Sequence, residues 1–504
     1  MPPRPVQILL VLSLSGLTSL AQKSSRIPDD TIAEVGAGII TVRDLFERIE
    51  LMPWEGKDRR RTFDSSMVHA LESLVAERLL ASEAAERGIG FDTLMLLRLG
   101  GLEREFARDE LYRREVAGGV SVSPGEMKTG LRKYALLLRV VVLRCSSELT
   151  GRKLSESMRA PSTPEGAGPP GSGEGVLSRD TVTVEFGVAD ESLEEHAYAL
   201  DPAHPVSAPY HSENLGWVVL LLLEAHTDTR YAQQDVSKQL ASVRDILRSR
   251  KARIRGREFM RAVLRAQRAE ADRELLGLLA GSIYKIIMSD TAAHRSRGRF
   301  LLAPEEVDIL ESDLRPDLAR ALVSTAGAPL SLGMAIQAFR IEPFSSPSLG
   351  RNTFLSVLNE SVKRIVEEEF LAREAYRLHL ENTPSVKHDL AAWSDNWRAL
   401  MMEQSIPPGE SGEGGMTPDS LRSMVRPAIR EGKRRHVIDR FIAGLAQKYG
   451  VKMYYDRLQK IDISRHNMFT RRLIGFGGMM NAAPLLKPEW GWVREYLRAN
   501  HQVP

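Results

Sequence analysis

Residues 71–88 read LESLVAERLLASEAAERG, and a similar stretch, VKRIVEEEFLAREAYRLH, occupies residues 362–379. The two align at an offset of 362 minus 71, or 291, which places apolar over apolar positions. The segments before them repeat as well, because residues 40–53 align with residues 330–343 at an offset of 330 minus 40, or 290. The sequence therefore predicts two copies of one helical unit, with a different segment inserted between them.

The first copy has the pattern of amphipathic helices. Residues 67–87 carry apolar side chains at the helical period, and Gly88 suits the left-handed residue that ends such a helix. Thr41 is a favourable N-cap for a shorter helix, with Asp44 in its first turn. Residues 31–40 combine branched residues with a glycine turn, which indicates a short strand before that helix.

Composition places the chain among ordinary globular proteins. Its 504 residues exceed what one hydrophobic core covers, so we expect several domains. A net charge of +3 lacks the strong basic footprint of nucleic-acid binding, and we expect no nucleic-acid partner. Cys145 is the single cysteine, which excludes an internal disulfide; we expect its thiol to be buried. With no phosphate-binding glycine loop and no metalloprotease motif, we expect no cofactor and no metal.

The first 21 residues have the features of a secretory signal. Arg4 precedes an apolar run, and Ser19-Leu20-Ala21 fits a cleavage site. The run is too short to span a bilayer in the mature protein. We therefore expect export, in a bacterium to the periplasm, with no integral membrane segment after cleavage. A buried N-terminal helix or an uncleaved anchor is the alternative.

The segment between the two copies predicts a small α/β domain. Residues 134–145, 181–186 and 216–224 are rich in branched and apolar residues, which is typical of strands, and residues 192–200 predict a helix. Residues 160–175 (APSTPEGAGPPGSGEG) cannot build a packed core and predict a flexible loop.

Three patterns together resemble the SurA/PrsA family of secreted folding factors. Ile40-Thr41-Val42-Arg43-Asp44-Leu45 followed by the spaced apolar positions of residues 71–88 is similar to that family's N-terminal helices. Val122-Ser123-Pro124-Gly125-Glu126 stands where the family passes into a parvulin-type prolyl isomerase domain. Val206-Ser207-Ala208-Pro209 followed by Gly216-Trp217-Val218-Val219 is similar to the end of parvulin domains. The resemblance implies a helical chaperone unit with a parvulin-like (PpiC-like) insert.

The insert departs from the parvulin pattern where that family carries its histidines. The first strand offers Arg139 and Val140 at the expected position, and the last strand offers Trp217 or Val218. We therefore expect a degenerate isomerase site and assign no catalytic residue. Three histidines lie outside the motif positions, either as substitutes or as solvated loop side chains: His196, His204 and His211.

An arginine-rich helix follows the insert. We interpret residues 244–268 as a solvated face; binding of nucleic acid or anionic lipid is the alternative. The resemblance implies that this region returns to pack on the N-terminal helices. For the tail, residues 466–504, the sequence suggests no specific role.

The predicted fold class is α+β and mostly helical, a duplicated SurA-like helical unit with a small α/β insert after the first copy. The expected divisions are a signal peptide (1–21), copy one (22–130), the parvulin-like domain (131–228), return helices packing on copy one (229–290), copy two (300–406), a flexible loop (407–418), a C-terminal helix and strand (419–465) and the tail (466–504).

The leading functional hypothesis is an exported folding factor that binds unfolded or nascent exported polypeptides, with the oligomeric state left open. An active prolyl isomerase is the first alternative, and a non-enzymatic envelope assembly protein is the second. In the insert, the candidate peptide-binding residues are Trp217, His211, Tyr210 and Phe186. In the two copies they are Phe46, Met52, Trp54, Phe339 and Phe344, each of which could instead be a core residue.

Overall fold

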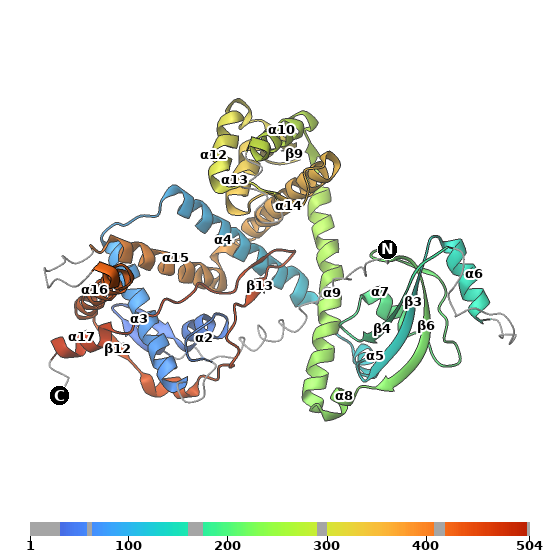
Figure 1. Ribbon diagram of the computed structural model, residues 1–504, viewed down its shortest axis with the longest axis horizontal. Helices are drawn as coiled ribbons and strands as arrows, with labels where there is room; N and C mark the ends of the chain where they lie inside the picture. Colours follow the sequence, from blue (N-terminus) through green and yellow to red (C-terminus); the bar gives the residue numbers. More distant parts are fainter. Residues whose placement is uncertain (1–30, 58–62, 160–174, 290–299, 408–418, 501–504) are drawn as a thin grey trace. The chain divides into compact units, whose positions relative to one another are not determined.

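The computed structural model describes residues 31–57, 63–159, 175–289, 300–407 and 419–500 (Figure 1). Helices predominate and the sheets are small and antiparallel, which confirms the mostly helical α+β class. No helix within these ranges is both long and apolar enough to cross a membrane.

The chain divides into two compact units. Residues 119–254 form the insert unit, and residues 31–118 combine with residues 255–500 in the helical unit. The predicted signal peptide and nearly all of the two predicted flexible loops lie outside the described residues.

The insert unit is built on one antiparallel sheet with the strand order β4-β3-β6-β5. Val140 and Val142 of β3 face one core while Val141 and Leu143 face another, so the apolar run of this strand is buried on both sides. Helix α7 covers the first face and α6 the second. The elements are α5 (Pro124–Tyr134), β3 (Leu136–Cys145), α6 (Glu148–Arg159), β4 (Val176–Glu185), α7 (Glu191–Ala197), β5 (Tyr210–Ser212), β6 (Gly216–Thr227) and α8 (Thr229–Gln233).

Local predictions for this unit are confirmed at two places. Ser123 and Glu126 form the capping box that starts α5, with Pro124 in the first turn. Cys145 is a buried free thiol.

The helical unit contains a first core that joins the two ends of the chain. Strand β12 pairs with β1, so the sheet order is β12-β1-β2, and helices α2, α3, α15 and α16 cover it. The capping box predicted at Thr41 and Asp44 is present at the start of α2. The elements are β1 (Thr31–Val35), β2 (Gly38–Thr41), α2 (Val42–Glu50), α3 (Phe63–Glu86), α15 (Pro384–Ser405), α16 (Asp419–Tyr449) and β12 (Val451–Met453).

A second core of the same unit has the same order of elements as the first, with strands followed by a short helix and a long helix. A three-stranded sheet, β10-β9-β7, precedes a short helix and a long helix, α13 and α14. The elements are α9 (Val236–Gln267), β7 (Glu270–Ala271), α10 (Arg273–Ser289), α12 (Pro304–Asp313), β9 (Ala321–Ser324), β10 (Leu330–Ser331), α13 (Leu332–Ile341) and α14 (Arg351–Arg377). The resemblance implies return helices that pack on copy one. Phe259 and Met260 of α9 do pack against Ala107 and Leu111 of that copy, whereas α10 buries Leu275, Leu279 and Ile283 in the second core.

The third helix of each predicted copy packs on the long helix of the other. Helix α4 (Thr93–Leu111) packs along α14, whereas α15 packs along α3, and α4 and α15 contact each other (Figure 1). The two third helices start 291 residues apart, at Thr93 and Pro384 (384 minus 93). This number equals the offset between the similar stretches 71–88 and 362–379.

The arginine-rich helix α9 is not simply a solvated face. In the insert unit, Arg250 pairs with buried Glu194 at 2.5 Å and stacks over Phe186, and Lys251 pairs with Glu126 at 2.7 Å. These contacts explain part of the basic run as structural ion pairs.

The tail is an integral part of the helical unit. It forms a hairpin, β13 (Arg471–Leu473) and β14 (Met479–Asn481), and ends in α17 (Trp492–Ala499). Trp492 is fully buried in the first core, and its indole N–H donates to the Glu72 carbonyl at 3.1 Å. Nothing in the periodicity of the tail indicated this role.

Candidate binding groove

A groove in the helical unit is the principal candidate site. Helices α4, α13 and α14 line it, together with Phe476 in the loop of the tail hairpin, and its volume is about 1430 Å³. Three large apolar side chains are exposed within it, Leu96 (57%), Met334 (38%) and Ile341 (40%). Apolar surface held open in a cavity of this size is suited to binding part of another molecule.

Two ion pairs between α4 and α14 lie in the lining of the groove. Arg104 on α4 pairs with Glu369 on α14, and Arg108 pairs with Glu368 at 3.3 Å. These contacts join the third helix of one predicted copy to the long helix of the other.

Glu105 and Glu367 are acidic groove residues that have no ion pair within the described parts of the chain. Burial raises the pKa of Glu105, and the carboxylates of Glu368 and Glu342 raise it further, against the opposing effect of Arg108. Burial also raises the pKa of Glu367. The groove therefore combines exposed apolar side chains with acidic groups that lack a direct cationic partner.

The structure places the candidate residues of the two copies in different surroundings. Phe339 and Phe344 are each 2% exposed and belong to the second core, but both also line the groove from beneath. Met52 and Trp54 are buried, and the Trp54 indole N–H donates to the Ser66 carbonyl at 3.0 Å. Phe46 packs against the first core. Met52 and Trp54 are therefore core residues, whereas Phe46 is partly buried against the first core.

In the insert unit, three of the four candidates lie on one strand pair but on opposite faces. His211 and Trp217 contact edge to face at 5.3 Å between ring centroids, on the face covered by α6. Tyr210 points to the α7 face, where it stacks on His196 at 3.6 Å. Phe186 is buried at the opposite corner of the sheet, after the end of β4. The four residues therefore do not form one site.

The position expected to carry a parvulin histidine is occupied by a surface ion pair. Arg139 donates to Glu224 at 2.8 Å, and its neighbour Val140 is buried in the sheet. Of the other histidines, His204 contacts Asp201 in an exposed turn. None of these contacts assembles an acid–base pair around the aromatic side chains.

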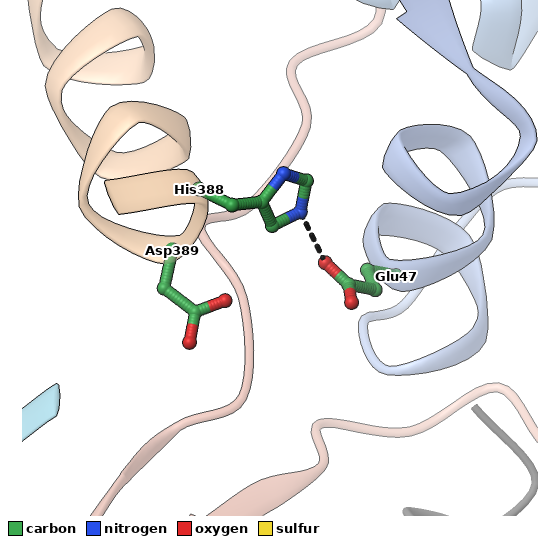
Figure 2. Close-up of side chains that lie close together, drawn as sticks. All are labelled: Glu47, His388 and Asp389. Carbon is green, nitrogen blue, oxygen red and sulfur yellow. Dashed lines mark hydrogen bonds and ion pairs between the residues drawn. The ribbon is translucent and has the colours of Figure 1, made fainter. Parts of the chain in front are cut away.

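A cluster of Glu47, His388 and Asp389 brings together residue types that bind metals (Figure 2). His388 Nε2 lies 3.0 Å from Glu47 Oε2, and Asp389 accepts from Arg472 at 2.7 Å. The hydrogen bond to Glu47 raises the pKa of His388. Burial alone would raise the pKa of Glu47, but hydrogen bonds from His388 and Arg43 outweigh this effect and lower it. The ligand atoms are thus already engaged, and the cluster joins α2 to α15.

Comparison with known proteins adds little to this geometry. No model of a protein family matches the chain, and no curated protein matches it. Among solved structures, a peptidylprolyl isomerase (PrsA) from Bacillus cereus aligns with 16% identity and a TM-score of 0.21, over 49% of this chain and 95% of that one. This similarity is too low to show a shared fold or function.

Proposed function

We propose that this chain is an exported folding factor whose helical unit binds segments of unfolded polypeptides in the groove of α4, α13 and α14. The observation that carries the proposal is the exposure of Leu96, Met334 and Ile341 within one cavity of about 1430 Å³. Unfolded chains expose apolar side chains, and flexible methionine and leucine side chains can pack against many of them.

The proposal includes a duplication in which two copies exchange their third helices. It is supported by an ion pair that recurs with its charges reversed. Arg104 on α4 pairs with Glu369 on α14, and the residues 291 positions away are Asp395 (395 minus 104) and Arg78 (369 minus 78), which pair between α15 and α3. The groove then lies between the third helix of the first copy and the other two helices of the second.

Filling the groove with a side chain tests the proposal. Gly100 lies on α4 in the groove and has open space where a Cβ would point, so Gly100→Phe should fold and obstruct the groove. Gly277→Phe on α10 is the matched control, because Gly277 also has open space and lies outside the groove lining.

The assay is aggregation of a chemically unfolded model protein with the purified chain added. The wild type and Gly277→Phe should suppress aggregation, while Gly100→Phe should lose most of this effect. Equal suppression by all three would refute the groove as the client site. Binding of one stoichiometric folded partner instead would favour an assembly protein.

Isomerase activity is a separate question that concerns the insert unit. The contact between His211 and Trp217 is the one observation that favours a rebuilt site there. Isomerisation requires weakening of amide resonance in an apolar pocket, with a barrier of about 20 kcal/mol to lower. A protease-coupled assay on a proline peptide tests for isomerase activity. Turnover that is lost in Trp217→Ala would establish the activity. If there is no turnover above background, polypeptide binding is the only function proposed.

A further inference from the structure

We propose that the open groove selects client segments in which an arginine or lysine adjoins small apolar residues. This inference rests on the proposed function and specifies the ligand of the same site. Its basis is a comparison with the corresponding place in the first copy, between α2, α3 and α15, which the chain's own tail covers.

In the first copy a buried polar triad closes the corresponding place. The Arg48 guanidinium donates to both carboxylate oxygens of Glu77, each at 2.6 Å, and the Asn396 amide donates to Glu77 at 2.7 Å. Arg48 and Glu77 are 4% and 6% exposed. The Glu77 carboxylate is therefore paired with one cation, Arg48, and accepts a further hydrogen bond from the neutral amide of Asn396.

In the second copy the same positions hold a different set of groups. Glu77 corresponds to Glu368 at the offset of 291, whereas Arg48 corresponds to Ala338 at the offset of 290. Asn396 corresponds to Glu105 (396 minus 291). The cation has been replaced by a methyl group and the neutral donor by a second carboxylate, and all three residues line the open groove. Arg108 pairs with Glu368 at 3.3 Å, but Glu105 forms no ion pair within the described chain.

The tail shows how a chain segment occupies the first-copy site. Ala482, Ala483 and Pro484 cover the site and leave a cavity of about 20 Å³, and the Leu485 carbonyl accepts from Asn396 at 3.0 Å. The same tail supplies Arg472, which pairs with Asp389 of α15 at 2.7 Å and with Asp109 of α4 at 2.5 Å. A non-helical segment with small apolar residues and an arginine is thus the internal precedent for the ligand.

A cationic client side chain would take the place that Arg48 holds in the first copy. It would lie beside Glu105 and Glu368, while apolar residues of the client cover Met334 and Leu96. Charge complementarity in a half-buried setting supplies selectivity, and the apolar contacts supply the remaining affinity.

The experiment compares two fluorescein-labelled peptides by anisotropy. The first has the tail sequence of residues 471–486, RRLIGFGGMMNAAPLL, and the second is the same peptide with both arginines changed to glutamine. The wild-type chain should bind the first about fivefold more tightly at low salt, the effect expected of a partly exposed ion pair. Gly100→Phe should weaken the binding of both peptides, which would locate them in the groove.

Two substitutions test the role of charge without closing the groove. Glu105→Gln should remove the preference for the arginine peptide and leave the affinity of the glutamine peptide unchanged. Glu195→Gln on α7 is the matched control, since it removes the same charge from an exposed residue of the insert unit. The double variant Ala338→Arg/Glu105→Asn restores the first-copy arrangement and should also abolish the preference.

The outcomes separate this inference from the function on which it rests. Equal binding of the two peptides by the wild type, or a preference that survives Glu105→Gln or is equally lost in Glu195→Gln, would overturn the inference alone. Absence of peptide binding would overturn it too, even if Gly100→Phe still abolished the suppression of aggregation. Suppression of aggregation that does not depend on Gly100 would overturn the proposed function itself.

Discussion

Replacing Arg48 by methionine would expose the energetic role of the buried triad in the first copy. The change keeps an unbranched apolar stem and removes both hydrogen bonds that the guanidinium donates to Glu77 at 2.6 Å. Glu77 is 6% exposed and would retain only the amide of Asn396 as a donor. A carboxylate left buried without its cation destabilises a protein by about 3–5 kcal/mol.

Adding Glu77→Met to Arg48→Met, which completes a double-mutant cycle, should recover most of that loss of stability. In Arg48→Met/Glu77→Met both charges are absent, and the pair is replaced by apolar groups of similar volume. Such replacements are often close to neutral, so the double variant should lie within about 1–2 kcal/mol of the wild type. Glu368→Gln, at the corresponding position of the open groove, should cost less than Arg48→Met, because the Glu368 side chain is 31% exposed and solvent screens its single contact with Arg108 at 3.3 Å.

Urea unfolding followed by tryptophan fluorescence measures these differences. All tryptophans except Trp217 belong to the helical unit, so the signal reports mainly on the unit that contains the triad. A loss below about 1 kcal/mol in Arg48→Met would refute the reasoning. A double variant no more stable than the single variant would refute it equally, since the penalty would then not come from the orphaned carboxylate.

Four further predictions concern the remaining charges and the tail. Burial raises the pKa of Glu72 to about 7, so the stability that protonated Glu72 contributes is fully present below about pH 4.5 and is lost as pH rises through 7. Glu72→Gln should therefore stabilise the chain at pH 8, by up to about 3 kcal/mol, and have little effect at pH 4, as measured by urea unfolding at both values. Exchanging the charges in Arg104→Glu/Glu369→Arg should recover part of the stability that the single changes lose, and the loss of the second Glu369 pair, with Arg373 at 2.7 Å, should keep the recovery incomplete; a double-mutant cycle measures this coupling. Trp492→Ala should cost about 3–5 kcal/mol and increase proteolysis of the tail, because the side chain is fully buried and anchors α17; an unchanged melting temperature would contradict this. Binding of the arginine peptide should weaken as pH falls, and should do so above the pH at which an ordinary glutamate titrates, because the pKa values of Glu105 and Glu367 are raised; a pH-independent affinity would count against their involvement.

Much of the secondary structure could be predicted because local signals agree with the final fold. The capping residues Thr41 and Ser123 start helices where expected, and Gly88 adopts a left-handed conformation after α3. The apolar run of 134–145 forms β3, which is covered on both faces. These features depend on neighbours in the sequence, and periodicity therefore reports them.

The site could not be predicted in the same way because it depends on contacts between distant segments. Their aromatic character predicts Phe339 and Phe344 as binding residues, and both lie against the groove. The exposed apolar side chains there are Leu96, Met334 and Ile341. Trp54 and Met52 are equally good candidates by residue type, because they are an aromatic residue and a methionine of the other predicted copy, but both are core residues. Aromatic or methionine character alone does not distinguish a groove from a core.

The tail shows the same limit. Trp492 hydrogen-bonds to Glu72 and Arg472 pairs with Asp109, and these partners are 420 and 363 positions apart in the chain. Aligning the two predicted copies at the offsets 290 and 291 could have pointed to the site, since it places Ala338 opposite Arg48. That difference becomes meaningful only once Glu77 and Arg48 are known to touch.

Photo-crosslinking from within the groove tests the central claim most directly. Met334 would be replaced by p-benzoylphenylalanine, and Leu278 on α10, which is similarly exposed at 41% but lies outside the groove, would carry the same group as a control. Irradiation in the presence of a chemically unfolded model protein should give a crosslinked product from position 334 and little from position 278. Equal crosslinking from both positions, or none from position 334 while aggregation is still suppressed, would contradict the account.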